Sequence, residues 1–492
     1  MKNLKDKVKK EFESQIDTEL DFDTTTLNPN PKSFQNKIII RRSIIAAVSV
    51  VALCIISIPI SIPILLMLDT KDTFKTYKKE YTQSELKQIE LNTFKKLNDV
   101  SYPEQFSKRE VSDEYRESVI DFSNKMYFAI DQNNAAFSPL NLYMNLSILS
   151  LASNNENTLK EFDNLLGMSK ESREKDFINA YINDYFYNSS GTMQMYNGCF
   201  ATNKFDANND FISSLTRHYT EAYQVDFNSD ASINKILSWI DQRVQDRNFL
   251  NKNNLEIDEN TAILLISTLY YKNTWFHEFD KQDTIENVFY LEDRSTLTIP
   301  YLSHKYFGEC YDYEDYISCY DYYVNGLKIK YIIPKTDVSK SIFELIHNKK
   351  IFVDDETRRI KPETSWYENP IINLKVPKFE SECLVDFSSA LKANGLRSLF
   401  DPNSHSFDYA FDNLPSNMSI YLDYVKQKNH ISFDESGTTL KSVTFSGFKG
   451  ATSAAPMTTD TIDVNLNRPF VYIIYDSNDL PIFVGNLNNP IK

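Results

Sequence analysis

Histidine, serine and cysteine are the side chains of this chain best suited to act as metal ligands or nucleophiles, and they form no known catalytic motif. No two of the six histidines have the HExxH spacing of a zinc protease. Ser446 lies in Ser-Gly-Phe-Lys-Gly, which is not the G-x-S-x-G turn of α/β-hydrolases. The ten glycines form no phosphate-binding loop. A Ser-His-Asp triad draws on distant parts of a chain, so the sequence leaves one open. Nothing points to one, and we predict a protein that is not an enzyme and has no metal or cofactor site.

The five cysteines offer one candidate cross-link. They form no CxxC pair and have no metal-ligand spacing. Cys310 and Cys319 flank residues 311–318, which we predict to form a hairpin. A cross-strand disulfide would form there in an exported domain, and two buried free thiols are the alternative. The acidic pair Asp354-Asp355 is more typical of a solvated surface than of a general acid and base.

Residues 434–470 form an unusual segment near the end of the chain. Its middle is rich in small residues and poor in large apolar ones, and it holds three of the ten glycines, namely Gly437, Gly447 and Gly450. Apolar, β-rich sequence lies on both sides of it. A loop of this length inside a compact domain is uncommon, and it is usually either functional or disordered.

Composition and periodicity predict one large α+β domain. Hydrophobic residues make up 41% of the 492-residue chain, which is enough for a sizeable core. The net charge of −15 argues against a nucleic-acid partner. Ser112 is a candidate N-cap, and the residues after it have apolar positions at helical spacing. Residues 327–334 and 371–376 have the composition of strands, and strands dominate the later part of the chain.

Five segments, in order over about residues 113–492, resemble the serpins, the serine protease inhibitor family. They are Ser138-Pro139-Leu140 with Leu165-Leu166-Gly167; residues 267–275 (STLYYKNTW) with Phe279; Val376-Pro377-Lys378-Phe379 with Phe400-Asp401-Pro402; Glu435-Ser436-Gly437-Thr438-Thr439; and Pro469-Phe470 with residues 483–490 (FVGNLNNP). The resemblance implies about nine helices packed on three β-sheets, with an exposed reactive-centre loop at about residues 435–466 of a domain spanning 112–492.

The resemblance also implies a suicide-substrate mechanism. A target serine protease would cleave the loop and form an acyl-enzyme, and the freed loop would enter the large sheet as a new strand. The hinge residues would be Glu435, Gly437, Thr438, Leu440, Ser442 and Thr444. Side chains alternate along a strand, so Thr438, Leu440, Ser442 and Thr444 would all face the core. Leu440 is larger than the family pattern, and we expect it to slow insertion.

The candidate scissile region is Lys449, Ala451, Thr452, Met457 and Thr458. Counting forward from the hinge reaches Ala451-Thr452, whereas counting back from Pro469 reaches Thr458. The run that ends at Met457 suits an elastase-like or chymotrypsin-like protease, and Lys449 suits a trypsin-like one. A generic flexible loop cut by many proteases is the alternative.

The resemblance places Ser138, Ser267 and Gln427 under the sheet, where it opens. Ser267 and Gln427 stand where the family has a buried Asn and a buried His, and both can still form hydrogen bonds. We therefore predict a serine protease inhibitor. A non-inhibitory serpin-fold protein that binds other molecules or acts like a chaperone is the alternative.

The N-terminal region has the pattern of a membrane anchor. Residues 1–42 are polar and predicted to be disordered and cytoplasmic. Residues 43–68 carry no charge, and at about 1.5 Å per residue this run exceeds a hydrocarbon core of about 30 Å. It is too long for a cleaved signal peptide. Residues 69–111 resemble a charged, partly helical stalk. Arg41 and Arg42 favour a cytoplasmic N-terminus, which predicts a single-pass protein of the cell membrane with an extracellular serpin domain.

Overall fold

The computed structural model describes residues 93–103, 108–130, 136–187, 191–247, 249–258, 260–335, 340–347, 349–362, 368–440 and 461–491. All of them belong to one compact unit, Ser84–Lys492. No helix among them is long and apolar enough to cross a membrane. The predicted tail (1–42), the predicted transmembrane helix (43–68) and most of the predicted stalk lie outside these residues.

Nine α-helices lie in the described part of the chain, which agrees with the expected number. They are α5 Asp113–Ala129, α6 Pro139–Leu149, α7 Glu156–Leu166, α8 Lys170–Asn183, α9 Asn209–Arg217, α10 Asp230–Val244, α11 Lys252–Leu255, α12 Ile342–Ile346 and α13 Ser388–Ala393. Ser112 caps α5 as predicted, because its hydroxyl accepts a hydrogen bond from the Tyr115 amide. Val119, Phe122 and Met126 form the buried face of this helix.

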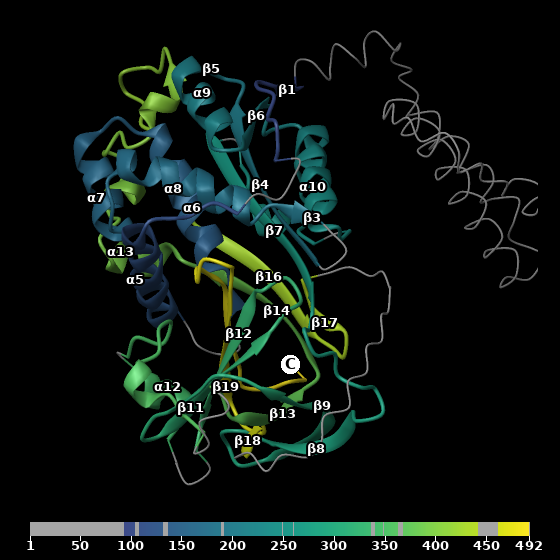
Figure 1. The fold of residues 1–492 in the computed structure, drawn as a ribbon. Helices are drawn as coiled ribbons and strands as arrows, with labels where there is room; N and C mark the ends of the chain where they lie inside the picture. Colours follow the sequence, from purple (N-terminus) through teal and green to yellow (C-terminus); the bar gives the residue numbers. More distant parts are fainter. Residues whose placement is uncertain are drawn as a thin grey trace, which may run out of the picture. The chain divides into compact units, whose positions relative to one another are not determined.

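The largest sheet has eight strands in the order β1-β6-β4-β7-β17-β16-β14, with β3 paired to β4. Figure 1 shows this sheet running beside helices α6 and α10. Its strands are β1 Phe94–Lys96, β3 Phe186–Tyr187, β4 Gly191–Thr202, β6 Thr220–Val225, β7 Ile263–Thr274, β14 Phe379–Asp386, β16 Lys426–Phe433 and β17 Gly437–Leu440. Within this sheet β4 and β6 are parallel, and the other pairs are antiparallel.

Two further sheets complete the expected set of three, and a two-stranded sheet is added. The six-stranded sheet contains β10 Cys310–Asp312, β11 Tyr316–Tyr322, β12 Lys328–Pro334, β19 Phe470–Tyr475, β20 Pro481–Leu487 and β2 Ala136–Phe137. The four-stranded sheet contains β18 Thr461–Asn465, β13 Ile371–Pro377, β9 Thr296–Phe307 and β8 Ile285–Tyr290. The small sheet pairs β15 Phe411–Asp412 with β5 Asp206–Ala207. Every residue of β19 and β20 is buried, so these two strands lie in the core.

The end of the predicted stalk is part of the folded domain. Strand β1 pairs with β6 through Phe94 and Val225. The Asn98 side chain donates to the Thr220 carbonyl and accepts from the Ala222 amide, so it continues the edge beyond β1. Residues 94–98 are therefore part of the folded domain, although they precede the predicted boundary at 112. The charge pattern of the sequence did not reveal strand β1, because a strand of three residues is too short to show a periodic pattern.

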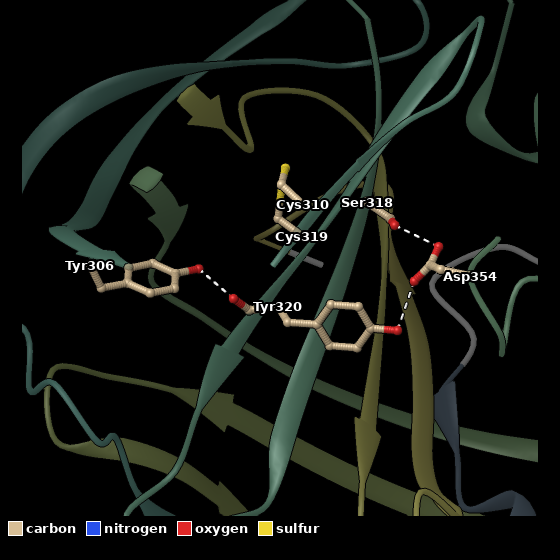
Figure 2. Close-up of a disulfide and its surroundings, with 6 residues drawn as sticks. All are labelled: Tyr306, Cys310, Ser318, Cys319, Tyr320 and Asp354. Atoms are coloured by element: carbon tan, nitrogen blue, oxygen red, sulfur yellow. Dashed lines mark hydrogen bonds between the residues drawn. A yellow bond between two sulfur atoms is a disulfide. The ribbon is translucent and has the colours of Figure 1, made fainter. Parts of the chain in front are cut away.

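The predicted hairpin around residues 311–318 is present, and Cys310 and Cys319 lie opposite each other in the β10–β11 register. The two cysteines form a disulfide, so the cross-linked alternative of the sequence prediction is present and the alternative of two free thiols is not (Figure 2). Beside it, Asp354 accepts hydrogen bonds from Ser318 and Tyr320 and forms a buried ion pair of 2.8 Å with Lys330. The prediction of a solvated surface was wrong for Asp354, because neighbours distant in sequence neutralise and bury it.

Candidate functional site

The hinge segment forms a strand inside the large sheet. Strand β17 lies between β7 and β16 at the C-terminal ends of both strands (Figure 1). Its four residues pair with Thr274 to Tyr271 of β7, and Thr438 and Thr439 pair with Phe433 and Ser432 of β16. The backbone of Leu440 lies opposite Tyr271. The first residues of the hinge therefore already occupy the sheet position that an inserted loop would need.

Gly437 is required at this entry point because the backbones approach closely. A Cβ atom at Gly437 would lie 1.9 Å from the Asn273 carbonyl oxygen and 2.9 Å from its carbon. Both are backbone atoms of β7, so neither can move aside as a side chain would. A larger residue would push the hinge away from β7.

Thr438 faces the core and is fully buried. Its hydroxyl lies 2.7 Å from the phenol oxygen of Tyr323, at the turn that follows β11. The ring of Tyr323 stacks on Trp275, with the ring centres 4.8 Å apart. The first inward side chain of the hinge, Thr438, is thus within hydrogen-bonding distance of a phenol group whose ring is packed in the core.

The start of the hinge and the residue before it are held by residues that follow β7 and by Lys378, which lies between β13 and β14. The Trp275 indole donates to the Asp434 carbonyl at 2.9 Å, and the Phe279 amide donates to the Glu435 carbonyl at 3.1 Å. The Glu435 carboxylate accepts hydrogen bonds from Lys378, at 2.9 Å, and from Thr284, at 3.1 Å. Burial alone would raise the pKa of Glu435, but the hydrogen bonds, first from Lys378, outweigh it and lower the pKa.

Beyond β17, toward the N-terminal ends of β7 and β16, no described strand lies between these two strands. Strand β7 pairs along its length with β4 on one side, but on the other side it pairs only with β17 in the part of the chain that the structure describes. Strand β16 likewise pairs fully with β14 and only briefly with β17. A cavity of about 560 Å³ lies between the facing edges of β7 and β16, and α6 contributes to its lining. Among the described residues, no strand pairs with these two facing edges beyond β17, so the cleft is suited to receive an extended peptide.

The structure brings the three predicted sheet-opening residues together around this cleft. Ser138, Ser267 and Gln427 all line it. Ser267 accepts a hydrogen bond from Asn145 of α6 at 2.8 Å. The Gln427 side-chain oxygen accepts from the Ser138 amide at the start of α6, at 2.7 Å. Each strand edge is therefore attached to the same helix by a polar side chain.

The other predicted site residues fall where the structure gives no description. Ser442, Thr444, Lys449, Ala451, Thr452, Met457 and Thr458 lie outside the described residues. For Leu440 the structure describes the backbone only. The roles assigned to all these residues, and the sheet-opening roles above, stay predictions.

Tyr323 and Lys378 are among the partners of the hinge that sequence reasoning missed. Lys378 falls in the segment that resembles the family, but the pattern does not reveal its ion pair with Glu435. Tyr323 is one of many tyrosines in a tyrosine-rich stretch, so nothing in the sequence distinguishes it. Both contacts join segments that are far apart along the chain.

Comparisons with known proteins agree with this architecture. The family described as Serpin (serine protease inhibitor) matches residues 117–490. Serpin-Z4 from Hordeum vulgare is 24% identical over 398 residues, which cover 75% of this chain and 95% of that protein. Human neuroserpin is 22% identical over 401 residues, covering 76% and 91% of the two chains.

Solved structures show the same fold. The crystal structure of the thermophilic serpin tengpin in its native state covers 79% of this chain and 97% of its own, with a TM-score of 0.66 and 21% identity. Serpin48 from the insect Tenebrio molitor covers 77% of this chain and 100% of its own, with a TM-score of 0.64 and 17% identity. The matched residues span most of the chain, and the chain belongs to the serpin (serine protease inhibitor) family.

Proposed function

We propose that the protein inhibits serine proteases as a suicide substrate. The observation that carries this proposal is the partly filled sheet. In the part of the chain that the structure describes, β17 pairs with only the C-terminal ends of β7 and β16, and a cleft lies between the remaining lengths of these strands. A cleaved loop that continues β17 toward the N-terminal ends of β7 and β16 would complete both ladders. Insertion of a cleaved loop requires room for one more strand between β7 and β16.

The chemical work in this mechanism belongs to the protease. Its serine oxygen attacks a loop carbonyl, the peptide bond breaks, and the leaving nitrogen takes a proton to become a new amino terminus. The hinge side of the loop stays bonded to the protease as an acyl ester. Insertion of the loop would then carry the protease along and distort its oxyanion hole, so that water no longer releases the ester.

The register of β17 indicates how insertion would proceed. Each further loop residue moves one position down β7 and β16, so that Thr444 would reach the level of Ser267 and Gln427. Thr444 shares the inward parity of Thr438. A hydroxyl would thus enter the cleft beside the two polar groups that attach the strands to α6. This match between loop and cleft supports insertion of at least residues 437–444.

The target is proposed from the loop sequence. Ala454-Ala455-Pro456-Met457 fits an elastase-like or chymotrypsin-like protease, with cleavage after Met457. Lys449-Gly450 would instead suit a trypsin-like protease. Mass spectrometry of the released C-terminal fragment identifies the bond, and a first cut outside residues 449–459 by every protease tried would contradict the assignment.

Denaturing gel electrophoresis tests whether the protein inhibits by forming a covalent complex. Incubation with a panel of serine proteases should give a covalent complex that survives detergent and heat. The variant Thr438→Arg should be cleaved at the same bond without forming the complex, because a charged side chain cannot enter the buried position. A protease whose catalytic serine is replaced by alanine should give neither. Cleavage of the parent protein without any complex would favour the non-inhibitory alternative. The observation behind that alternative is Leu440, which is larger than the family pattern at this hinge position and is expected to slow insertion.

A membrane anchor at residues 43–68 is a second part of the proposal. It is supported by the uncharged run and by Arg41-Arg42 before it. The serpin domain would then face outward from the cell membrane and meet secreted or surface proteases. The Cys310–Cys319 disulfide fits an oxidising compartment. Protease added to intact cells should degrade the domain, and resistance until the cells are lysed would contradict this orientation.

A further inference from the structure

We propose that Tyr323 is a positioning residue that holds the hinge of the uncleaved loop inside the large sheet by its hydrogen bond to Thr438. This deepens the proposed function, since it assigns a residue to the first step of insertion. Tyr323 lies outside the hinge and outside the cleft, at the turn between β11 and β12. The group that Tyr323 would hold is the hydroxyl group of Thr438.

The ring of Tyr323 is held rigidly. It stacks on Trp275 with an interplanar angle of 13°, and it meets the ring of Tyr271 edge to face at 6.1 Å. Its backbone forms an isolated bridge with Trp275, and its amide donates to the Leu327 carbonyl at 2.9 Å. The phenol oxygen is therefore in place before the hinge arrives, and little side-chain entropy is lost on binding.

Burial makes this hydrogen bond selective. Tyr323 is 1% exposed and Thr438 is 0% exposed, so each hydroxyl is cut off from water. Removing one partner leaves a buried hydroxyl without its hydrogen bond, and this costs more folding free energy than the hydrogen bond itself contributes. Replacing both partners by apolar groups changes the folding free energy little. The site therefore favours a hydroxyl-bearing residue at position 438. Burial also raises the pKa of Tyr323 well above its usual value, so the phenol keeps its proton at physiological pH.

The contact has a consequence for the reaction. The hinge is ordered before cleavage, and insertion would start from a paired strand of four residues instead of from free chain. Ordering each residue costs conformational entropy, so this start shortens the delay between acylation and insertion. A shorter delay leaves less time for water to release the protease. Tyr323 would thus raise the fraction of encounters that end in a trapped complex.

Hydrogen exchange of the uncleaved protein, followed by mass spectrometry, tests the proposal without any protease. Tyr323→Phe and Thr438→Val each remove one partner of the buried hydrogen bond between these two residues, and each should speed exchange at residues 437–440 on the order of tenfold. The double variant removes both hydroxyls and should return exchange close to the parent rate. Thr438→Ser keeps the hydroxyl and serves as the matched control, with exchange close to that of the parent.

The double variant separates positioning from a merely structural role. If Tyr323 only stabilised the core, Thr438→Val would not rescue Tyr323→Phe, and effects that simply add would overturn the proposal. Unchanged exchange in both single variants would overturn it as well. The trapped fraction is a second readout, which Tyr323→Phe should lower while the rate of loop cleavage stays the same. A parent protein that traps no protease would refute the proposed function, whereas the exchange result would still decide the role of Tyr323.

Discussion

Replacing Gly437 by alanine should force the hinge out of the large sheet. The added Cβ would lie 1.9 Å from the Asn273 carbonyl oxygen, whereas a close C···O contact is about 3.3 Å. The backbone would have to move by more than about 1 Å, which is incompatible with the β17–β7 register. Overpacking of this kind costs about 1–3 kcal/mol. Expulsion of the hinge also removes Thr438 from its buried position.

Melting curves and hydrogen exchange of the uncleaved protein measure this effect. At about 2–4 °C per kcal/mol for a domain of 150–250 residues, and less for a larger one, Gly437→Ala should lower the melting temperature by a few degrees. Exchange at residues 438–440 should become markedly faster. Ser436→Ala, at the exposed neighbouring position, is the control and should change neither. If Gly437→Ala leaves both measurements at the parent values, the close approach of hinge and β7 is refuted.

Three further changes test other parts of the structure. The carboxylate of Glu435 has a lowered pKa, so it stabilises the fold above its ordinary value of 4.5 and loses this contribution as the pH falls below it. The melting temperatures of the parent and of Glu435→Gln should therefore differ most near neutral pH and converge in acid; a difference independent of pH would contradict the ion pair with Lys378. Cys319→Ser removes a cross-link between residues nine apart, which is worth about 2–3 kcal/mol in the chain-entropy account, so its melting temperature should be lower. Equal melting under oxidising and reducing conditions would count against the disulfide. Leu440→Ala should relieve about 1–3 kcal/mol of overpacking during insertion and raise the trapped fraction, and an unchanged or lower fraction would contradict the expected hindrance.

Local signals in the sequence predict several elements of the fold well. Ser112 was identifiable as a cap because its effect reaches only three residues along the chain. The strands predicted at 327–334 and 371–376 appear as β12 and β13, within a residue at each end. Runs of apolar and β-branched residues determine such strands before any tertiary contact forms.

Contacts between distant segments could not be predicted in the same way. Strand β1 is an edge strand only because β6 lies beside it, and its own three residues carry no signal. Asp354 looks like a surface acid until Lys330 and Tyr320 are placed around it. The position of β17 between β7 and β16 is likewise a property of the whole sheet. The hinge was recognised by resemblance, whereas its place in the sheet before cleavage needed the structure.

Cleavage of the loop followed by a melting curve tests the central claim most directly. A strand as long as β16, which has 8 residues, would add ladder hydrogen bonds at about 0.5–1.5 kcal/mol each, in addition to apolar burial in the cleft. Protein cut between residues 449 and 459, with the cut verified by mass spectrometry, should therefore melt many degrees above the intact protein. An unchanged melting temperature after complete cleavage would show that the loop does not enter the cleft between β7 and β16, and it would contradict the proposed inhibitory mechanism.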